Sequence, residues 1–314
     1  MAVRHVLSIS ELGPETLSHL VDRAIEISAG DINGRQPLRG RMVGIYFRGT
    51  STRTRTAFTV GAVRLGAGTI AYGPNDLQIV TGETVQDTAR VLSNFLDALV
   101  IRTNQSIEEM RSMTAQNRMS IVNAMSENEH PTQAIADLAT LKEEFGHLDG
   151  VHVMYIGEGN NTAAALALAT ALTPGMRLTI VTPEDYGMRK DVLTNAQGLA
   201  QRNGAVIEEL HGVDKLPRDV DAVYATRWQT MGVSKSDPGW LEVFAPYKVT
   251  REMMEAVSKP AGTIFLHDLP AVRGGDVTNE VLDGPQSRAF RQAWHKLTGA
   301  MSVLEWCVAG GGVS

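Results

Sequence analysis

The chain has 314 residues, of which 43% are hydrophobic and 20% are charged, and its formal net charge is -6. This composition is typical of a folded globular protein and excludes a disordered chain, and the length favours two domains over one. A negative net charge without a basic block disfavours the nucleic-acid-binding proteins. The one cysteine, Cys307, excludes a disulfide within the chain. The sequence shows no signal peptide and no apolar run long enough to span a bilayer, so we expect a cytoplasmic protein with no membrane partner.

Strand-like and helix-like segments alternate along the chain in two stretches, the second of which begins at Val151. Such alternation is typical of parallel sheets that are covered by helices on both faces. The predicted strands are 42–47, 69–72, 98–101, 120–123, 151–156, 178–181, 205–208, 222–224 and 263–266. The predicted helices are 54–65, 85–96, 107–115, 130–145, 162–172, 188–202 and 285–308.

We therefore predict an α/β fold of two doubly wound parallel-sheet domains with an active-site cleft between them. The first domain would cover residues 1–146, with the helix 285–308 packed back on it, and the second would cover 147–284. Ligands of parallel α/β sheets bind beyond the carboxyl ends of the strands. Polar segments follow the predicted strands at 48–55, 102, 127–133, 157–161, 226–232 and 267–273.

The first chemistry-bearing motif follows the strand 42–47 and reads Arg-Gly-Thr-Ser-Thr-Arg-Thr-Arg over residues 48–55. Hydroxyls and backbone N–H groups at a helix N-terminus, beside arginines, form an anion site, and arginine binds phosphate oxygens in a bidentate manner. A plain Ser/Thr helix cap with solvated arginines would have the same sequence. The motif is not a Walker loop, because the glycines and the Gly-Lys-Ser/Thr ending of that loop are absent.

The second motif is His130-Pro131-Thr132-Gln133, at the start of a predicted helix. Residues three apart on a helix project to the same side, so His130 and Gln133 can both bind one small polar group. They can donate to a carbonyl oxygen or accept from an NH2 group. A helix cap or a core histidine is the plainer interpretation of His130 alone. No H-x-x-x-H spacing or cysteine cluster lies nearby, so we expect no metal.

Together, the segments 51–55 and 130–133 resemble the carbamoyl phosphate motifs of the aspartate/ornithine carbamoyltransferase family. The resemblance covers nearly the whole chain and includes the segments 76–78, 82–89, 157–161, 267–270 and 280–287, together with Arg102 after its strand. It implies transfer of a carbamoyl group from carbamoyl phosphate to a small amino acid, without a cofactor. It also implies a homotrimer with active sites at the subunit interfaces, into which the loop 78–83 of a neighbour would reach.

The resemblance implies roles for single residues. The carbamoyl phosphate ligands would be Ser51, Thr52, Arg53, Thr54, Arg102, His130, Gln133, Leu269 and Lys296. Thr54, Arg102 and His130 would polarise the carbamoyl carbonyl, and Gln133 would bind the carbamoyl NH2, which makes these four the catalytic residues. Leu269 would offer its backbone carbonyl, before a cis Pro270. Donors fixed at the carbonyl oxygen lower the barrier as an amine attacks.

The amino-acid site departs from both standard patterns of the family. The implied contacts are Asn161, Thr226, Arg227, Gln229, Thr230, Met231, Asp268 and Leu269. In the ornithine group, an aspartate that receives the substrate α-ammonium stands at the position of Thr226, and a serine at that of Thr230. Arg227 and Gln229 are similar to the aspartate group, where the arginine binds a side-chain carboxylate. Asp268 stands where the ornithine group has cysteine and the aspartate group has proline.

These features, with Glu-Asn-Glu before His130, resemble the carbamoyltransferases of peptide-antibiotic pathways that act on 2,3-diaminopropionate. Asp268 would receive the ammonium that Thr226 cannot, while Arg227 and Trp228 would shorten the pocket. A short diamino acid also offers more free amine, because its second ammonium lowers the amine pKa below about 10.4. We therefore expect 2,3-diaminopropionate as the acceptor, with ornithine, giving citrulline, and aspartate as the alternatives.

Two other classes of protein match parts of the sequence. A nicotinamide dehydrogenase would explain Gly157-x-Gly159 after a strand, but Thr162 replaces the third glycine of that fingerprint. A non-catalytic paralogue that binds carbamoyl phosphate would keep the same motifs. The presence of Arg102, His130 and Gln133 favours an enzyme over such a paralogue.

Overall fold

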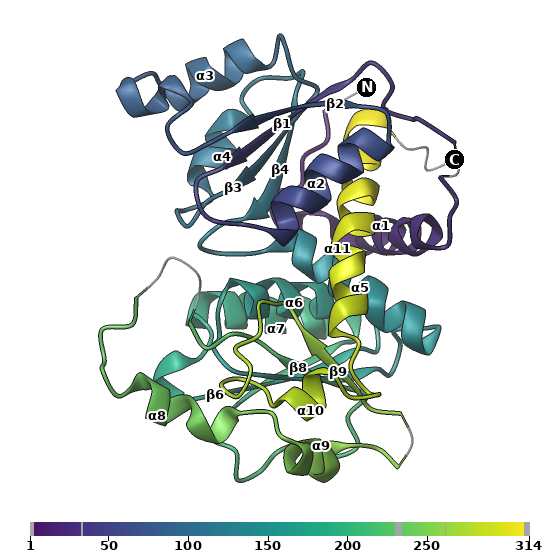
Figure 1. The fold of residues 1–314 in the computed structure, drawn as a ribbon, viewed down its shortest axis with the longest axis vertical. Coiled ribbons are helices and arrows are strands. Elements are labelled where there is room, and N and C mark those ends of the chain that lie inside the picture. The colour runs from purple at the N-terminus through teal and green to yellow at the C-terminus, as the bar shows by residue number, and fades with distance from the viewer. Residues whose placement is uncertain (1–2, 33, 230–233, 261, 311–314) are drawn as a thin grey trace. The chain divides into compact units, whose positions relative to one another are not determined.

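A computed structural model of the chain describes residues 3–32, 34–229, 234–260 and 262–310. The chain divides into two compact units, Met1–Ala139 with Trp294–Ser314, and Thr140–Ala293 (Figure 1). The chain passes from one unit to the other inside helix α5 (Pro131–Phe145) and inside helix α11 (Ala289–Leu304). The sequence had suggested boundaries after Gly146 and before Pro285, beyond the ends of these two helices.

The first unit is built on a parallel sheet with the strand order β2-β1-β3-β4. Its strands are β1 (Met42–Phe47), β2 (Gly68–Tyr72), β3 (Ala98–Arg102) and β4 (Ser120–Met125). Its other elements are η1 (Ile9–Glu11), α1 (Gly13–Ser28), α2 (Arg53–Arg64), η2 (Gln78–Thr81), α3 (Val85–Leu92), α4 (Glu108–Met113) and the π-helical turn η5 (Glu305–Ala309). From β1 the chain goes first to β2, on one side of β1, and then to β3, on the other side of β1. The topological switch point therefore lies between β1 and β3.

Both faces of this sheet are covered, as the fully buried strand β3 requires. Leu99 and Ile101 pack into a buried cluster with Leu92 of α3 and Met110 of α4. Figure 1 shows α3 and α4 on one side of the sheet and α2 on the other. Helix α2 lies so close to α11 that a Cβ atom at Gly61 would be 2.9 Å from Cγ of Met301.

The second unit is built on a parallel sheet with the strand order β7-β6-β5-β8-β9. Its strands are β5 (His152–Ile156), β6 (Arg177–Thr182), β7 (Val206–His211), β8 (Ala222–Ala225) and β9 (Ile264–His267). Its helices are α6 (Asn161–Ala171), η3 (Glu184–Tyr186), α7 (Lys190–Asn203), α8 (Trp240–Phe244), η4 (Ala245–Tyr247), α9 (Arg251–Val257) and α10 (Asn279–Leu282). The switch point here lies between β5 and β8.

The predicted fold class, two α/β units with parallel sheets, is confirmed. Each predicted strand is present within a few residues of its expected ends, whereas α1, α8, α9 and α10 were not predicted. The predicted helix 85–96 ends at Leu92, and the predicted helix 285–308 begins at Ala289. In the part of the chain that the structure describes, no helix is both long enough and apolar enough to cross a membrane.

Candidate active site

The motif 48–55 spans the end of β1 and the first turn of α2. Thr52 is the N-cap residue of α2, but its side chain makes no capping hydrogen bond, and the first turn contains no acidic residue. Thr52 therefore does not act as the plain helix cap that the sequence also allowed. A helix N-terminus without a neutralising carboxylate, next to Arg53, is suited to hold a phosphate.

The other two arginines of this motif are engaged by neighbouring side chains. Arg48 donates hydrogen bonds of 2.7 Å to both carboxylate oxygens of Glu109 and one of 2.6 Å to the hydroxyl of Tyr46. The guanidinium of Arg55 lies 5.3 Å from the ring centre of Phe47. Arg53 is the first residue of α2 and lies at the helix N-terminus, where an anion would bind.

Arg102 and Thr54 meet at the switch point of the first sheet. They are 5% and 4% exposed, and Nη1 of Arg102 donates to Oγ1 of Thr54 at 3.5 Å. Arg102 ends β3, and the β1–β3 pairing sets it opposite Phe47, at the end of β1. Two of the predicted catalytic residues are thus adjacent, because they follow neighbouring parallel strands.

His130 is buried just before α5 and is surrounded by positive charge. Burial lowers its pKa well below 6.5, and the charges of Lys296 and Arg102 lower it further. Its Nδ1 atom has no hydrogen-bond partner among the described residues. A neutral imidazole of this kind can still donate one hydrogen bond, as the polarisation of a carbonyl oxygen requires.

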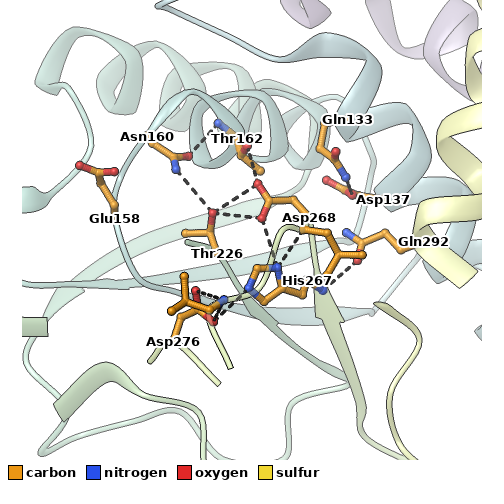
Figure 2. A network of polar contacts seen from close by, with 12 residues as sticks. Gln133, Asp137, Glu158, Asn160, Thr162, Thr226, His267, Asp268, Asp276 and Gln292 are labelled. Atoms are coloured by element: carbon orange, nitrogen blue, oxygen red, sulfur yellow. Dashed lines mark hydrogen bonds and ion pairs between the residues drawn. The ribbon is translucent and has the colours of Figure 1, made fainter. Parts of the chain in front are cut away.

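Gln133 lies on the first turn of α5, between Lys296 and a second buried residue. Its Oε1 accepts a hydrogen bond from Nζ of Lys296. Its Nε2 donates to Oδ1 of Asp137 at 2.7 Å (Figure 2). Lys296 reaches this position from α11, although it lies 163 positions further along the chain. Gln133 and Lys296 were predicted as site residues from the sequence, whereas Asp137 was not.

The turn that precedes His130 is fixed by the buried side chain of Glu129. The backbone N–H of Ile9 donates to the Glu129 carboxylate at 2.7 Å. Burial raises the pKa of Glu129 to about 7, although the hydrogen bonds from Ile9 and Ser8 act in the opposite direction. The N-terminal segment of the chain thereby holds the residue adjacent to His130.

In the second unit, the loops after β5 and β8 approach each other closely. Gly157 has a φ of +137°, and a Cβ atom there would lie 2.9 Å from Cγ2 of Thr226. Asn160 caps α6 by accepting from the N–H of Thr162 at 2.9 Å, and its Nδ2 donates to Oγ1 of Thr226 at 3.5 Å. The close packing of these two loops therefore explains why residue 157 is a glycine, and a bound dinucleotide is not needed to explain it.

Asp268, from the loop after β9, points toward the same two loops. Its carboxylate accepts hydrogen bonds from Oγ1 of Thr226 at 3.2 and 3.3 Å and from Oγ1 of Thr162 at 3.1 Å (Figure 2). Its side chain keeps 17% of its surface exposed. Two neutral donors thus hold a partly exposed carboxylate at the carboxyl edge of the sheet, where it can receive an ammonium group.

The loop that carries Asp268 is held by the buried residue before it. The backbone N–H of Leu269 donates to Nδ1 of His267 at 2.8 Å, and Nε2 of His267 lies 3.4 Å from Oδ1 of the buried Asp276. Leu269 has a φ of +52°, and the peptide bond between Leu269 and Pro270 is cis, as predicted. His267 and Asp276 therefore help to fix the backbone around Leu269.

The other predicted acceptor residues lie near these loops in sequence. Asn161 is the first residue of α6 and is 8% exposed, and Arg227 and Gln229 are half-buried. Trp228 is 7% exposed and stacks on Phe244, with their ring centres 5.6 Å apart. Packing within the second unit therefore explains the tryptophan at this position. Thr230 and Met231 lie outside the described residues.

One ion pair close to these loops was missed. Lys235 pairs with Glu158, and its Nζ lies 4.3 Å from the ring centre of Tyr186 and 5.1 Å from that of Phe244. The pair ties residue 235 to the loop after β5. A single sequence contains no signal for a contact between positions 77 residues apart.

The two units offer different chemistry. In the first unit, Arg102, Lys296 and the neutral His130 suit a ligand that has a negative charge and a carbonyl oxygen. In the second unit, the Asp268 carboxylate suits a cationic group. No group of three or more His, Cys, Asp or Glu side chains among the described residues could hold a metal ion.

Comparison with known proteins identifies the family. Residues 4–143 match the carbamoyl phosphate-binding domain of aspartate/ornithine carbamoyltransferase, and residues 149–307 match its aspartate/ornithine-binding domain. An ornithine carbamoyltransferase of Caldicellulosiruptor saccharolyticus is 37% identical over 310 residues, which is 98% of this chain and 99% of the relative. One of Methanothermobacter thermautotrophicus is 35% identical over 97% of this chain and 98% of the relative.

The solved structures agree with these relatives. The ornithine carbamoyltransferase of Pyrococcus furiosus is 32% identical, superimposes with a TM-score of 0.91, and is matched over 99% of this chain and 98% of that chain. The enzyme of Gloeobacter violaceus is also 32% identical, with a TM-score of 0.85 over 99% and 100% of the two chains. The chain therefore belongs to the aspartate/ornithine carbamoyltransferase family and is a carbamoyltransferase.

Proposed function

We propose that this carbamoyltransferase acts on the side-chain amine of a diamino acid and forms a ureido amino acid and phosphate. The observation that carries the proposal is the Asp268 carboxylate, which is held by the hydroxyls of Thr226 and Thr162. A diamino acid has a second ammonium group for this carboxylate to receive. The side-chain carboxylate of aspartate would instead be repelled by it.

The proposed roles in the first unit follow from charge and position. Ser51, Thr52, Arg53 and Thr54 hold the phosphate at the start of α2, with Lys296 as a further cation. The neutral amine attacks the carbamoyl carbon, a C–N bond forms, and the C–O bond to phosphate breaks. Arg102, His130 and Thr54 stabilise the negative charge that develops on the carbonyl oxygen. The nitrogen gives a proton to the departing phosphate, which leaves with its charge already bound.

The proposed roles in the second unit concern the acceptor. Asp268 receives the α-ammonium, while Asn161, Gln229 and the segment that contains Thr230 and Met231 bind the rest of the amino acid. Leu269 offers its backbone carbonyl to the carbamoyl NH2 or to the attacking amine. Arg227 binds a carboxylate of the acceptor. Positioning of both substrates supplies a large part of the rate acceleration.

Two diamino acids are candidates for the acceptor. The names of the relatives support ornithine better than the 2,3-diaminopropionate predicted from the sequence. One observation supports the shorter candidate, 2,3-diaminopropionate. The anionic group, Asp268, belongs to the loop after β9, and the Thr226 hydroxyl of the loop after β8 donates to it. A protein that acts on 2,3-diaminopropionate would belong to a peptide-antibiotic pathway.

The test compares acceptors at saturating carbamoyl phosphate. Released phosphate and the ureido product are measured with ornithine, 2,3-diaminopropionate and aspartate. We expect kcat/KM for one of the diamino acids to exceed that for aspartate by at least about tenfold, or about 1.4 kcal/mol. The ratio between the two diamino acids identifies the acceptor. A preference for aspartate would contradict the proposal, and so would the absence of product with all three.

We also propose a homotrimer, on the basis of the family resemblance. Apolar side chains near the loop 78–83 support it, since Val80, Val91 and Phe95 are 56%, 49% and 67% exposed in the single chain. Light scattering of the purified protein tests the assembly. A trimer, or a multiple of one, is expected, and a monomer at working concentration would contradict it. Phe95→Asp should weaken the assembly if this surface is part of the interface.

A further inference from the structure

The side-chain amide of Gln133 lies between two opposite charges. Its Nε2 donates to the Asp137 carboxylate at 2.7 Å, and its Oε1 accepts from the Lys296 ammonium. Gln133, Asp137 and Lys296 are 1%, 0% and 9% exposed. Asp137 comes one turn after Gln133 on α5, so the two side chains share a face of the helix, as Figure 2 shows.

An amide has a donating end and an accepting end, and rotation about its last bond exchanges them. In the present orientation, both ends meet a partner of the right charge. In the reversed orientation, the NH2 group would face an ammonium, and the oxygen would face a carboxylate. The interior strengthens such electrostatic preferences, because little water screens them. The two charges therefore select one orientation of the Gln133 amide.

We propose that Asp137, together with Lys296, is a positioning residue that fixes the orientation of the Gln133 amide and so selects a carbamoyl over an acyl group. This inference rests on the proposed contact between Gln133 and the carbamoyl NH2. The oxygen of an amide has two acceptor positions. Lys296 occupies one of them and leaves the other for the NH2 of carbamoyl phosphate.

Acetyl phosphate is the matched probe for this role, because it has a methyl group in place of the NH2. A methyl group cannot donate to Oε1 of Gln133, so an oriented oxygen favours carbamoyl phosphate alone. A site that hydrogen-bonds a ligand group discriminates strongly against an analogue that lacks the group. A change in the ratio of the two affinities therefore reports on the Gln133 amide, whereas a loss of general structure lowers both.

The experiment measures calorimetric affinities for carbamoyl phosphate and acetyl phosphate in the full-length protein, without an acceptor. The variants are D137N, Q133A and the double variant. We expect D137N to weaken carbamoyl phosphate binding by about tenfold and acetyl phosphate binding by less than about twofold. In the Q133A background, D137N should cause no further change in the ratio. Glu143→Gln is the control on the same helix, since Glu143 pairs with Arg291 and not with Gln133.

An equal loss of both affinities in D137N, or an undiminished effect in the Q133A background, would overturn the proposal. If D137N does not fold, Lys296→Met tests the second residue that orients the Gln133 amide. This variant should lower the ratio of carbamoyl phosphate affinity to acetyl phosphate affinity when Gln133 is present and leave that ratio unchanged in Q133A. Any other pattern overturns the proposal. Because no acceptor is added, failure here is distinct from failure of the diamino acid proposal.

Discussion

The hydroxyl of Thr226 lies 3.2 Å from the carboxylate of Asp268, so the loop after β8 holds a negative charge that the loop after β9 supplies. The ornithine pattern places its aspartate at the position of Thr226. In this chain, the carboxylate belongs to Asp268 in the loop after β9, and the Thr226 hydroxyl donates to it. The region can thereby keep a site for an ammonium group, although its sequence departs from that pattern.

Arg53→Ala should abolish measurable binding of carbamoyl phosphate while the fold survives. Arg48 and Arg55 are engaged with Glu109 and Phe47 and cannot replace its charge-assisted contacts to phosphate. Calorimetry measures the affinity, and circular dichroism checks the fold. Arg64→Ala, at the far end of the same helix, is the matched control and should bind normally. An unchanged affinity in a folded Arg53 variant would refute the assignment.

His130 should remain neutral throughout the physiological pH range. Burial and the charges of Lys296 and Arg102 lower its pKa, so protonation is expected only well below pH 6.5. In the unfolded chain, the imidazole binds a proton near about 6.5, so its contribution to stability is complete above that pH and is lost as the pH falls. Imidazole NMR signals, assigned with His130→Asn, provide the measurement. A titration step of His130 near 6.5 would contradict the expectation.

Glu129→Gln should stabilise the protein at alkaline pH. The folded carboxyl has a pKa of about 7 against 4.5 for the ordinary group, so the folded state binds its proton more tightly. That contribution to stability is present at acidic pH and is lost as the pH rises through 7. Glutamine keeps the acceptor for the Ile9 N–H without the charge. The gain in unfolding free energy should approach about 3 kcal/mol at about pH 8 and vanish at about pH 4.

Denaturant unfolding of the Glu129 variant at the two pH values gives this difference. Glu127→Gln, two positions earlier and exposed, is the matched control and should show little pH-dependent change. A Glu129 variant that is less stable than the wild type at alkaline pH would disprove the burial argument.

The strands and the carbamoyl phosphate motifs could be predicted because their signals are local. Buried parallel strands are short apolar runs, and the residues that follow neighbouring strands meet at one edge, as Arg102 and Thr54 do. Helix α1 could also have been found. Its buried residues Leu17, Leu20, Val21 and Ala24 follow the spacing of a helix face.

The supporting contacts could not be predicted, because they join residues far apart in the chain. Lys296 meets Gln133 across 163 positions, and Lys235 meets Glu158 across 77. The sequence does not distinguish Asp137 from other residues of the helix. Its role is indicated by its burial and by its hydrogen bond to Gln133. The packing of Trp228 likewise depends on a residue elsewhere in the chain, Phe244, on which it stacks.

The most direct test of the account is the effect of Asp268→Asn on the two substrates separately. If Asp268 receives the α-ammonium of a diamino acid, kcat/KM for that acceptor should fall by about tenfold to a hundredfold, because a hydrogen bond between charged groups is lost. The calorimetric affinity for carbamoyl phosphate should stay within about twofold. Thr226→Val should cause a smaller loss of the same kind. An Asp268 variant that uses the diamino acid as well as the wild type does would contradict the account.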